Sequence, residues 1–174
     1  MSKLLIMVFN TITTAFWILC GGFRNISWSL TRKYGIAVAV LPEKKLRGMP
    51  AAGASTVFGG IIFLSDYMAD DSSAMIRFTI LHEKAHCRKW RAMPGLAVFR
   101  QGKGHGKKTA AYEYAADLYA AEHGEVEGGI ELLTVCHEAG KDPKTREQIL
   151  ASGADLRDPI RRIHALKRWI ARQH

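Results

Sequence analysis

The sequence predicts an α+β protein in which a short antiparallel sheet is followed by helices. Between residues 35 and 64, short apolar runs are bounded by glycine and proline, as is typical of strands. From residue 73 onward, segments long enough for helices lie between capping and breaking residues. The chain has 174 residues, of which 48% are hydrophobic, and this is enough to bury one core.

A hydrophobic segment without any charge, residues 4–22, precedes the sheet. It is long enough to cross the ~30 Å hydrocarbon core of a bilayer as a helix, and Trp17 lies near one end, where interfacial aromatics often occur. We therefore expect a single-pass N-terminal membrane anchor with its linker over residues 1–34 and a folded domain over residues 35–174. The alternative is a helix that packs on the domain. More Lys and Arg follow the segment than precede it, which favours a cytoplasmic body but leaves the orientation open.

Three strands are expected before the first long helix. Residues 35–41 predict a buried strand, because they form a short apolar run that proline terminates. Residues 54–58 and 61–64 predict two more strands, joined by a tight turn at Gly59 and Gly60. The last two strands are therefore expected to form a hairpin.

Helices are expected over the segments that follow. Asp70, Asp71 and Ser72 offer side-chain oxygens that can cap the first helix, and Gly124 ends the second. The predicted helices cover residues 73–89, 109–123, 126–139, 143–152 and 159–172. A basic, glycine-rich stretch separates the first two helices and predicts a mobile surface loop.

His82, Glu83 and His86 form an H-E-x-x-H motif within the first predicted helix. Side chains four residues apart lie on one face of an α-helix, about one turn from each other. Two imidazoles placed in this way can bind one Zn²⁺, while the Glu beside the first His can act on a zinc-activated water. Because the chain has 7 His, the motif alone favours a zinc peptidase without establishing one.

A third ligand is expected from the next helix, because a catalytic zinc takes three protein ligands and keeps one position open. Glu113 and Asp117 are again four residues apart and share one helical face. Glu113 is the natural carboxylate ligand, and Asp117 can accept the outer N–H of a zinc-bound histidine. On their own these acids would be interpreted as exposed helix residues. Next to H-E-x-x-H, the combination favours a metal site.

These two motifs together resemble the gluzincin metallopeptidases, and their surroundings are most similar to the membrane peptidases that include the HtpX heat-shock proteases and the CAAX-prenyl endopeptidases. The resemblance implies a zincin-like fold, a Zn²⁺ cofactor and peptide hydrolysis. Near its end that family has a His-Pro segment followed by an Arg-Ile helix, whereas Asp158 stands here where the His would be. The resemblance therefore implies that oxyanion or substrate contacts come from this region, where Arg161, Arg162 and His164 are the candidates.

A second resemblance, carried by residues 77–83 and 115–121, is to the peptidase domain of the ImmA/IrrE regulators. Those proteins are soluble and cut or bind repressors, so this resemblance implies a soluble regulator peptidase with the same zinc ligands. A hydrolase of cell-wall peptides and a zinc-binding domain without activity are further alternatives. The leading hydrophobic segment favours the membrane family.

The charge and cysteine content limit the partners. A net charge of +9 favours anionic partners such as acidic lipids or a polyanionic wall. A nucleic-acid partner is not expected, since no reading motif accompanies the scattered cations. We expect a protein or peptide substrate and a membrane, and leave the oligomeric state open. The three cysteines are too few and odd in number for a disulfide framework.

The mechanism expected from these residues is that of a zinc-dependent endopeptidase. Zn²⁺ lowers the pKa of water towards ~7, and Glu83 takes the proton and later delivers it to the leaving amine. An extended substrate is expected to pair with an exposed sheet edge, for which Ile61 to Leu64 is the candidate.

Overall fold

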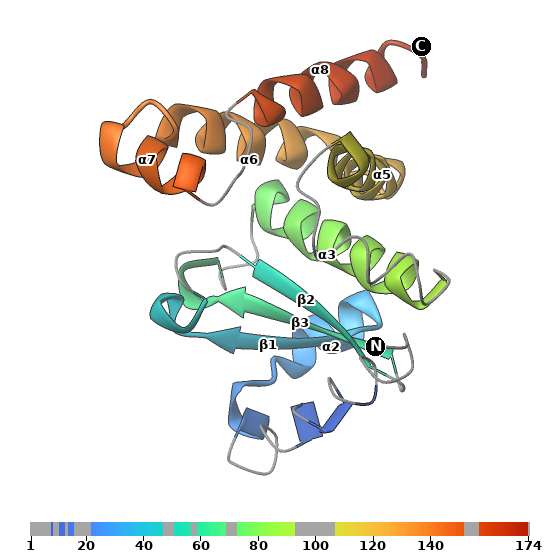
Figure 1. Ribbon diagram of the computed structural model, residues 1–174. Helices are drawn as coiled ribbons and strands as arrows, with labels where there is room; N and C mark the ends of the chain where they lie inside the picture. Colours follow the sequence, from blue (N-terminus) through green and yellow to red (C-terminus); the bar gives the residue numbers. More distant parts are fainter. Residues whose placement is uncertain are drawn as a thin grey trace.

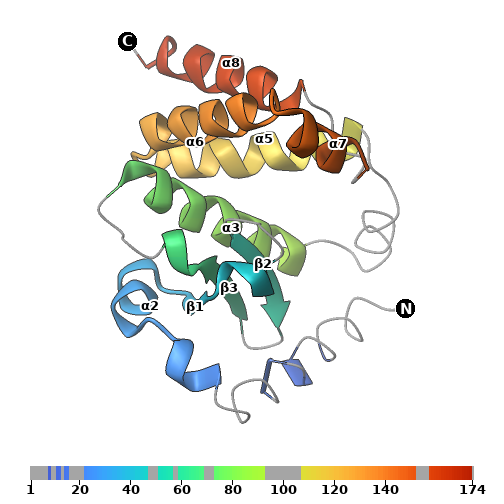
Figure 2. The same cartoon turned by 90° about the vertical axis from the view of Figure 1, so that its left-hand side faces the viewer.

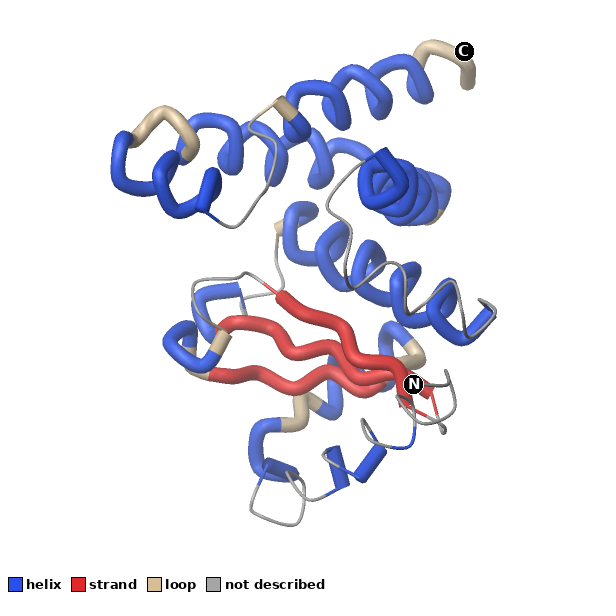
Figure 3. Tube along the Cα trace, in the orientation of Figure 1, coloured by secondary structure: helices blue, strands red, loops and turns tan. Residues whose placement is uncertain are grey.

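The computed structural model describes residues 22–46, 51–56, 59–68, 73–92, 107–151 and 157–173, together with residues 8, 11–12 and 14–15. Within these residues it confirms the α+β class, with one three-stranded sheet and six α-helices (Figure 3). Two predicted features lie largely outside the described residues. They are the hydrophobic segment 4–22, of which only a few residues are described, and the loop expected after the first long helix, of which residues 93–106 are not described. No described helix combines the length and the apolar character that a bilayer crossing requires.

The sheet is mixed, so the prediction of a wholly antiparallel sheet was wrong. Strand β1 (Ala37–Leu41) pairs in parallel with β3 (Gly59–Ser65), and β3 pairs antiparallel with β2 (Ala51–Thr56). The strand order is therefore β1-β3-β2. Strand β3 takes the centre because it is apolar on both faces: Ile61 and Ile62 point to opposite faces and both are at most 3% exposed. A central strand has no free edge, so the prediction that Ile61 to Leu64 bind substrate was also wrong.

Gly59 and Gly60 were predicted to form the hairpin turn. They are instead the first two residues of β3. A Cβ atom at Gly60 would lie 2.8 Å from Cβ of Cys87 and 2.9 Å from its Sγ. Real Cβ atoms do not approach neighbours this closely, so glycine at this position allows β3 to pack against the helix that carries Cys87.

The five helices predicted after the sheet are found in the predicted order, with small shifts at their ends, whereas α2 lies in the segment that was predicted as a linker. Helix α3 begins one residue later than predicted, after Ser73, whose Oγ accepts a hydrogen bond from the backbone N–H of Ile76 at 3.3 Å. Gly124, with φ of +90°, follows α5 and ends it as predicted. The six helices are α2 (Trp28–Tyr34), α3 (Ala74–Ala92), α5 (Lys107–Glu122), α6 (Val126–Ala139), α7 (Pro143–Ala151) and α8 (Asp158–Ile170).

Helix α3 lies in the middle of the molecule, between the sheet and the helices α5, α6 and α8 (Figure 1). Strands β2 and β3 contact one side of it, and α5 and α6 contact the other. Helix α8 packs on α5 and α6 and is the layer farthest from the sheet, while α2 covers the opposite face of the sheet (Figure 2). The core forms where these layers meet, and Ile62, Phe78 and Leu166 are all fully buried there.

Two glycines determine how closely α6 crosses α3. A Cβ atom at Gly128 would lie 2.1 Å from the carbonyl oxygen of Ala74, and one at Gly129 would lie 2.3 Å from the ring of Phe78. No side chain fits at either position, because α6 lies directly against the first turns of α3. This close crossing brings α8, which packs on α6, within reach of side chains from α3 and α5.

Candidate metal centre

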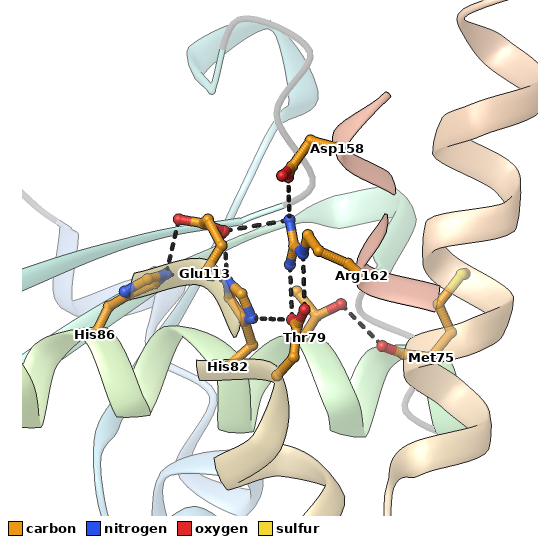
Figure 4. Close-up of polar contacts among 8 residues, drawn as sticks. Met75, Thr79, His82, His86, Glu113, Asp158 and Arg162 are labelled. Carbon is orange, nitrogen blue, oxygen red and sulfur yellow. Dashed lines mark hydrogen bonds and ion pairs between the residues drawn. The ribbon is translucent and has the colours of Figure 1, made fainter. Parts of the chain in front are cut away.

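Nitrogen and oxygen donors from α3 and α5 meet at one point (Figure 4). The two Nε2 atoms of His82 and His86 are 3.0 Å apart, and each lies 3.3 Å from a different carboxylate oxygen of Glu113. Ligand atoms bound at ~2.0–2.1 Å around a tetrahedral zinc are ~3.3 Å from each other. The three residues predicted as ligands are therefore brought together with separations that suit such an ion, and this group could hold a metal.

The helical repeat of α3 and small residues on α5 produce this arrangement. His82 and His86 are one turn apart, and their rings meet edge to face with centroids 4.6 Å apart. Ala116 and Ala120 on α5 are at most 2% exposed. Their short side chains let α5 approach α3 closely enough for Glu113 to reach both imidazoles.

Asp117, one turn after Glu113, orients the first histidine. Its Oδ1 accepts a hydrogen bond from Nδ1 of His82 at 2.9 Å, and the residue is 1% exposed. Because Nδ1 carries the proton in this bond, Nε2 is the nitrogen of His82 that faces Glu113 and His86. This is the arrangement that the spacing of Glu113 and Asp117 predicted.

Arg162 from α8 holds both acidic side chains of α5 in place. Its Nε and Nη2 each donate to one oxygen of Asp117 at 2.7 Å, which is the bidentate geometry that guanidinium and carboxylate favour. Its Nη1 lies 3.3 Å from Oε2 of Glu113 and 3.6 Å from Oδ2 of Asp158. All three guanidinium nitrogens are thus directed at carboxylates, which suits a positioning role for Arg162, and the substrate contact that the family resemblance implied stays a prediction.

The two other residues predicted near the transition state lie elsewhere on α8. Arg161 and His164 are both exposed to solvent, whereas the Arg162 side chain is only 13% exposed. Asp158 was not predicted as a site residue, although its spacing of four from Arg162 places the two side chains on one helical face. The spacing of four residues between Asp158 and Arg162 was the feature of the sequence from which this contact could have been predicted.

At each residue of this cluster, burial shifts the pKa in one direction and the ionic contacts shift it in the other. Burial opposes the charged form of Asp117, but hydrogen bonds from Arg162 and His82 outweigh it and lower the pKa of the carboxyl group. Burial likewise opposes ionisation of Glu113, and its contacts with His82 and His86 outweigh this and lower its pKa. Burial lowers the pKa of His82, while the hydrogen bonds to Asp117 and Glu113 outweigh it and raise the pKa to about 9. The ionised carboxylates therefore attract a cation to Nε2 of His82, as either a proton or a metal.

The metal-free protein is expected to lose about 2–3 kcal/mol of unfolding free energy between pH 6.5 and pH 9. The pKa of His82 is raised on folding from 6.5 to about 9. Its contribution is thus fully present below pH 6.5 and is lost as the pH rises through 9. Urea unfolding in the presence of a chelator at several pH values measures this slope. In Asp117→Asn the slope should be shallower, and an unfolding free energy that stays constant over this range in the wild type would contradict the assignment.

Glu83 faces the edge strand β2. A Cβ atom at Gly53 of β2 would lie 3.0 Å from Oε2 of Glu83 and 3.0 Å from Sγ of Cys87. Any larger residue at position 53 would therefore push against the Glu83 carboxylate. Gly53 could not be identified from the sequence, because its importance depends on the packing of β2 against α3.

The centre is thus assembled from three helices, α3, α5 and α8, with β2 beside it. Its residues lie up to 80 positions apart, since His82 and Arg162 both contact Asp117. Comparison of the chain with protein-family models, with curated proteins and with solved structures gives no match.

Proposed function

We propose that this protein is a zinc-dependent endopeptidase of the gluzincin type with a zincin-like fold. The observation that supports this most strongly is the convergence of His82, His86 and Glu113 at separations of 3.0–3.3 Å, with Asp117 hydrogen-bonded behind His82. Two imidazoles and one carboxylate are a common ligand set of catalytic zinc in peptidases. The membrane anchor expected over residues 1–34 remains part of the proposal and depends on the sequence alone.

The side chains around the site have separate roles in the proposed hydrolysis. When bound by the three ligands, Zn²⁺ would lower the pKa of water and polarise the scissile carbonyl. The carboxylate of Glu83 accepts the proton of the attacking water and returns it to the nitrogen of the leaving amine. Asp117 keeps Nδ1 of His82 protonated so that Nε2 stays available as a ligand, and Arg162 holds Asp117 in this position.

An extended peptide would pair with β2. This strand is at the edge of the sheet, and its residue Gly53 lies next to Glu83. Backbone N–H and C=O groups on a free edge can add a strand of a bound peptide. Such a peptide would pass alongside the general base, which the central strand β3 could not achieve.

The experiment that tests the proposal combines metal analysis with peptide hydrolysis. Purified protein is expected to contain one zinc per chain and to cleave a casein-type substrate, with cleavage lost on chelation and restored by added zinc. Glu113→Ala should weaken zinc binding by more than the ~10–100-fold that loss of an outer-shell partner causes. Glu122→Ala, which removes an exposed acid from the same helix, serves as the matched control and should leave zinc binding unchanged.

Two results would contradict different parts of the proposal. Undiminished zinc in Glu113→Ala would mean that this carboxylate is not a ligand. Stoichiometric zinc in the wild type without cleavage of any peptide would leave the metal centre standing and would reject the enzyme in favour of a zinc-binding domain.

A further inference from the structure

The outer side of α8 carries a row of cationic side chains. Arg161, His164 and Arg168 are spaced three and four residues apart and lie on one face of α8, and Arg157 and Arg172 continue the row in the turns just before and after the helix. All five are exposed, and so is Lys167 beside them. We call these six residues the basic row; at a rise of 1.5 Å per residue it is roughly 20 Å long.

The basic row contains no acidic side chain. Residues 157–173 contain six Lys or Arg and one acid, a net charge of +5 out of the chain's +9. The single acid, Asp158, is turned towards Arg162 and the metal centre. Neighbouring α6 differs, because Glu127, Glu131 and Glu138 are exposed along it. One side of α8 therefore presents cations without an exposed acid among them, and residues 84–112, with eight Lys or Arg and no acid, are a second basic segment of the chain.

The basic row does not serve the packing of α8. Leu166, Ile163 and Trp169 form the side of α8 that packs against the core. The helix dipole also disfavours cations at the N-terminal end, where Arg157 and Arg161 lie. The dipole favours Lys167 and Arg168 at the other end, but no residue of the row belongs to the hydrophobic core, and a surface of one sign fits an anionic partner.

We propose that the basic row binds the phosphate backbone of duplex nucleic acid without reading its sequence. Four of the five permanent cations in the row are Arg, whose planar fork matches a phosphate. A duplex presents one negative charge per ~1.7 Å, so roughly twelve phosphate charges lie along a row of roughly 20 Å. The sequence alone did not favour such a partner because no reading motif accompanies the cations; the structure adds that the cations of this row are all exposed.

The side chains around the basic row argue against other polyanions. The one large apolar residue of α8 in the exposed class is Ile160, at 37%, so the helix offers little to insert into a bilayer. Binding to anionic lipid by charge alone gives only ~1 kcal/mol per cation. No exposed aromatic residue stands in the row to stack on the bases of a single strand. A row of cations with no apolar side chain to insert and no aromatic ring to stack favours duplex phosphates, and binding to anionic vesicles is tested as the competing outcome.

Fluorescence anisotropy with two 20-bp DNA duplexes of unrelated sequence tests this proposal. Both duplexes should bind equally, and log K should fall with log[salt] with a slope near −4 to −5, about −0.9 for each phosphate contact. Arg161→Ser/Arg168→Ser should flatten the slope by about 2 and weaken binding roughly 50-fold at 100 mM salt. Far-UV circular dichroism confirms that this variant is folded.

Lys44→Ser/Lys45→Ser is the matched control, because it removes the same charge from the exposed 3₁₀ helix η2 (Glu43–Lys45) that follows β1 in the sheet layer, away from α8 (Figure 1). It should change duplex affinity by less than about threefold, as expected for charges outside the contact. Three outcomes would each overturn the proposal. The control could lose as much affinity as the α8 variant, the protein could fail to bind the duplex at 50 mM salt, or the basic row could bind phosphatidylserine vesicles but no duplex. Zinc and peptidase activity play no part in this test.

Discussion

Arg162→Met is expected to lower the free energy of unfolding of the metal-free protein by about 3–5 kcal/mol. Asp117 is 1% exposed and loses both 2.7 Å hydrogen bonds from the guanidinium, so its charge stays buried without its main partner. Glu113 loses the contact at 3.3 Å as well, and zinc affinity should fall about 10–100-fold because the ligands are no longer held in place. Urea unfolding and zinc competition with a chromogenic chelator measure the two effects.

Arg161→Met is the matched control for this prediction. It removes the same charge one residue away, from an exposed side chain, and should change stability by no more than about 0.5 kcal/mol. Arg162→Lys keeps the charge but loses the planar guanidinium that donates two parallel hydrogen bonds. Its unfolding free energy and zinc affinity are expected to lie between those of the wild type and Arg162→Met. If the Met variants at 161 and 162 were equally stable and bound zinc equally, the positioning role of Arg162 would be refuted.

Glu83→Gln is expected to reduce peptide hydrolysis by about 10²–10⁴-fold while zinc stays bound. Gln keeps the size of the side chain next to Gly53 but cannot accept a proton from water. The proposed metal ligands His82, His86 and Glu113 are unchanged, so the metal content should equal that of the wild type. Initial rates with a fluorescent casein, normalised to bound zinc, measure the effect.

Glu122→Gln provides the control, since it makes the same change at an exposed position on α5. It should hydrolyse the substrate at the wild-type rate. Activity in Glu83→Gln within a few-fold of the wild type would show that another group moves the proton, and loss of zinc in this variant would mean that Glu83 supports the metal site.

The chain sequence determined the identities of the residues in the candidate metal site through short-range geometry. Residues four apart on an α-helix share a face whatever the rest of the molecule does, so H-E-x-x-H and the pair Glu113 and Asp117 were sufficient to predict which side chains meet. Helix ends were predicted to within a few residues for the same reason, because caps such as Gly124 act on their own turn. The sequence also predicted the α+β class correctly.

Only the tertiary structure decided how these local units combine. Arg161 and Arg162 are neighbours of the same type, and which of them turns inward depends on how α8 lies on α5 and α6. Strand β3 is central because both of its faces are apolar and both are buried in that position, whereas an edge position would expose more of them. Which strand is central depends on all three strands together. Gly53 and Gly60 matter because a helix more than twenty residues away in sequence packs against them. Helical periodicity acts over one turn, whereas these choices depend on contacts between distant segments, and such contacts exist only in the folded chain.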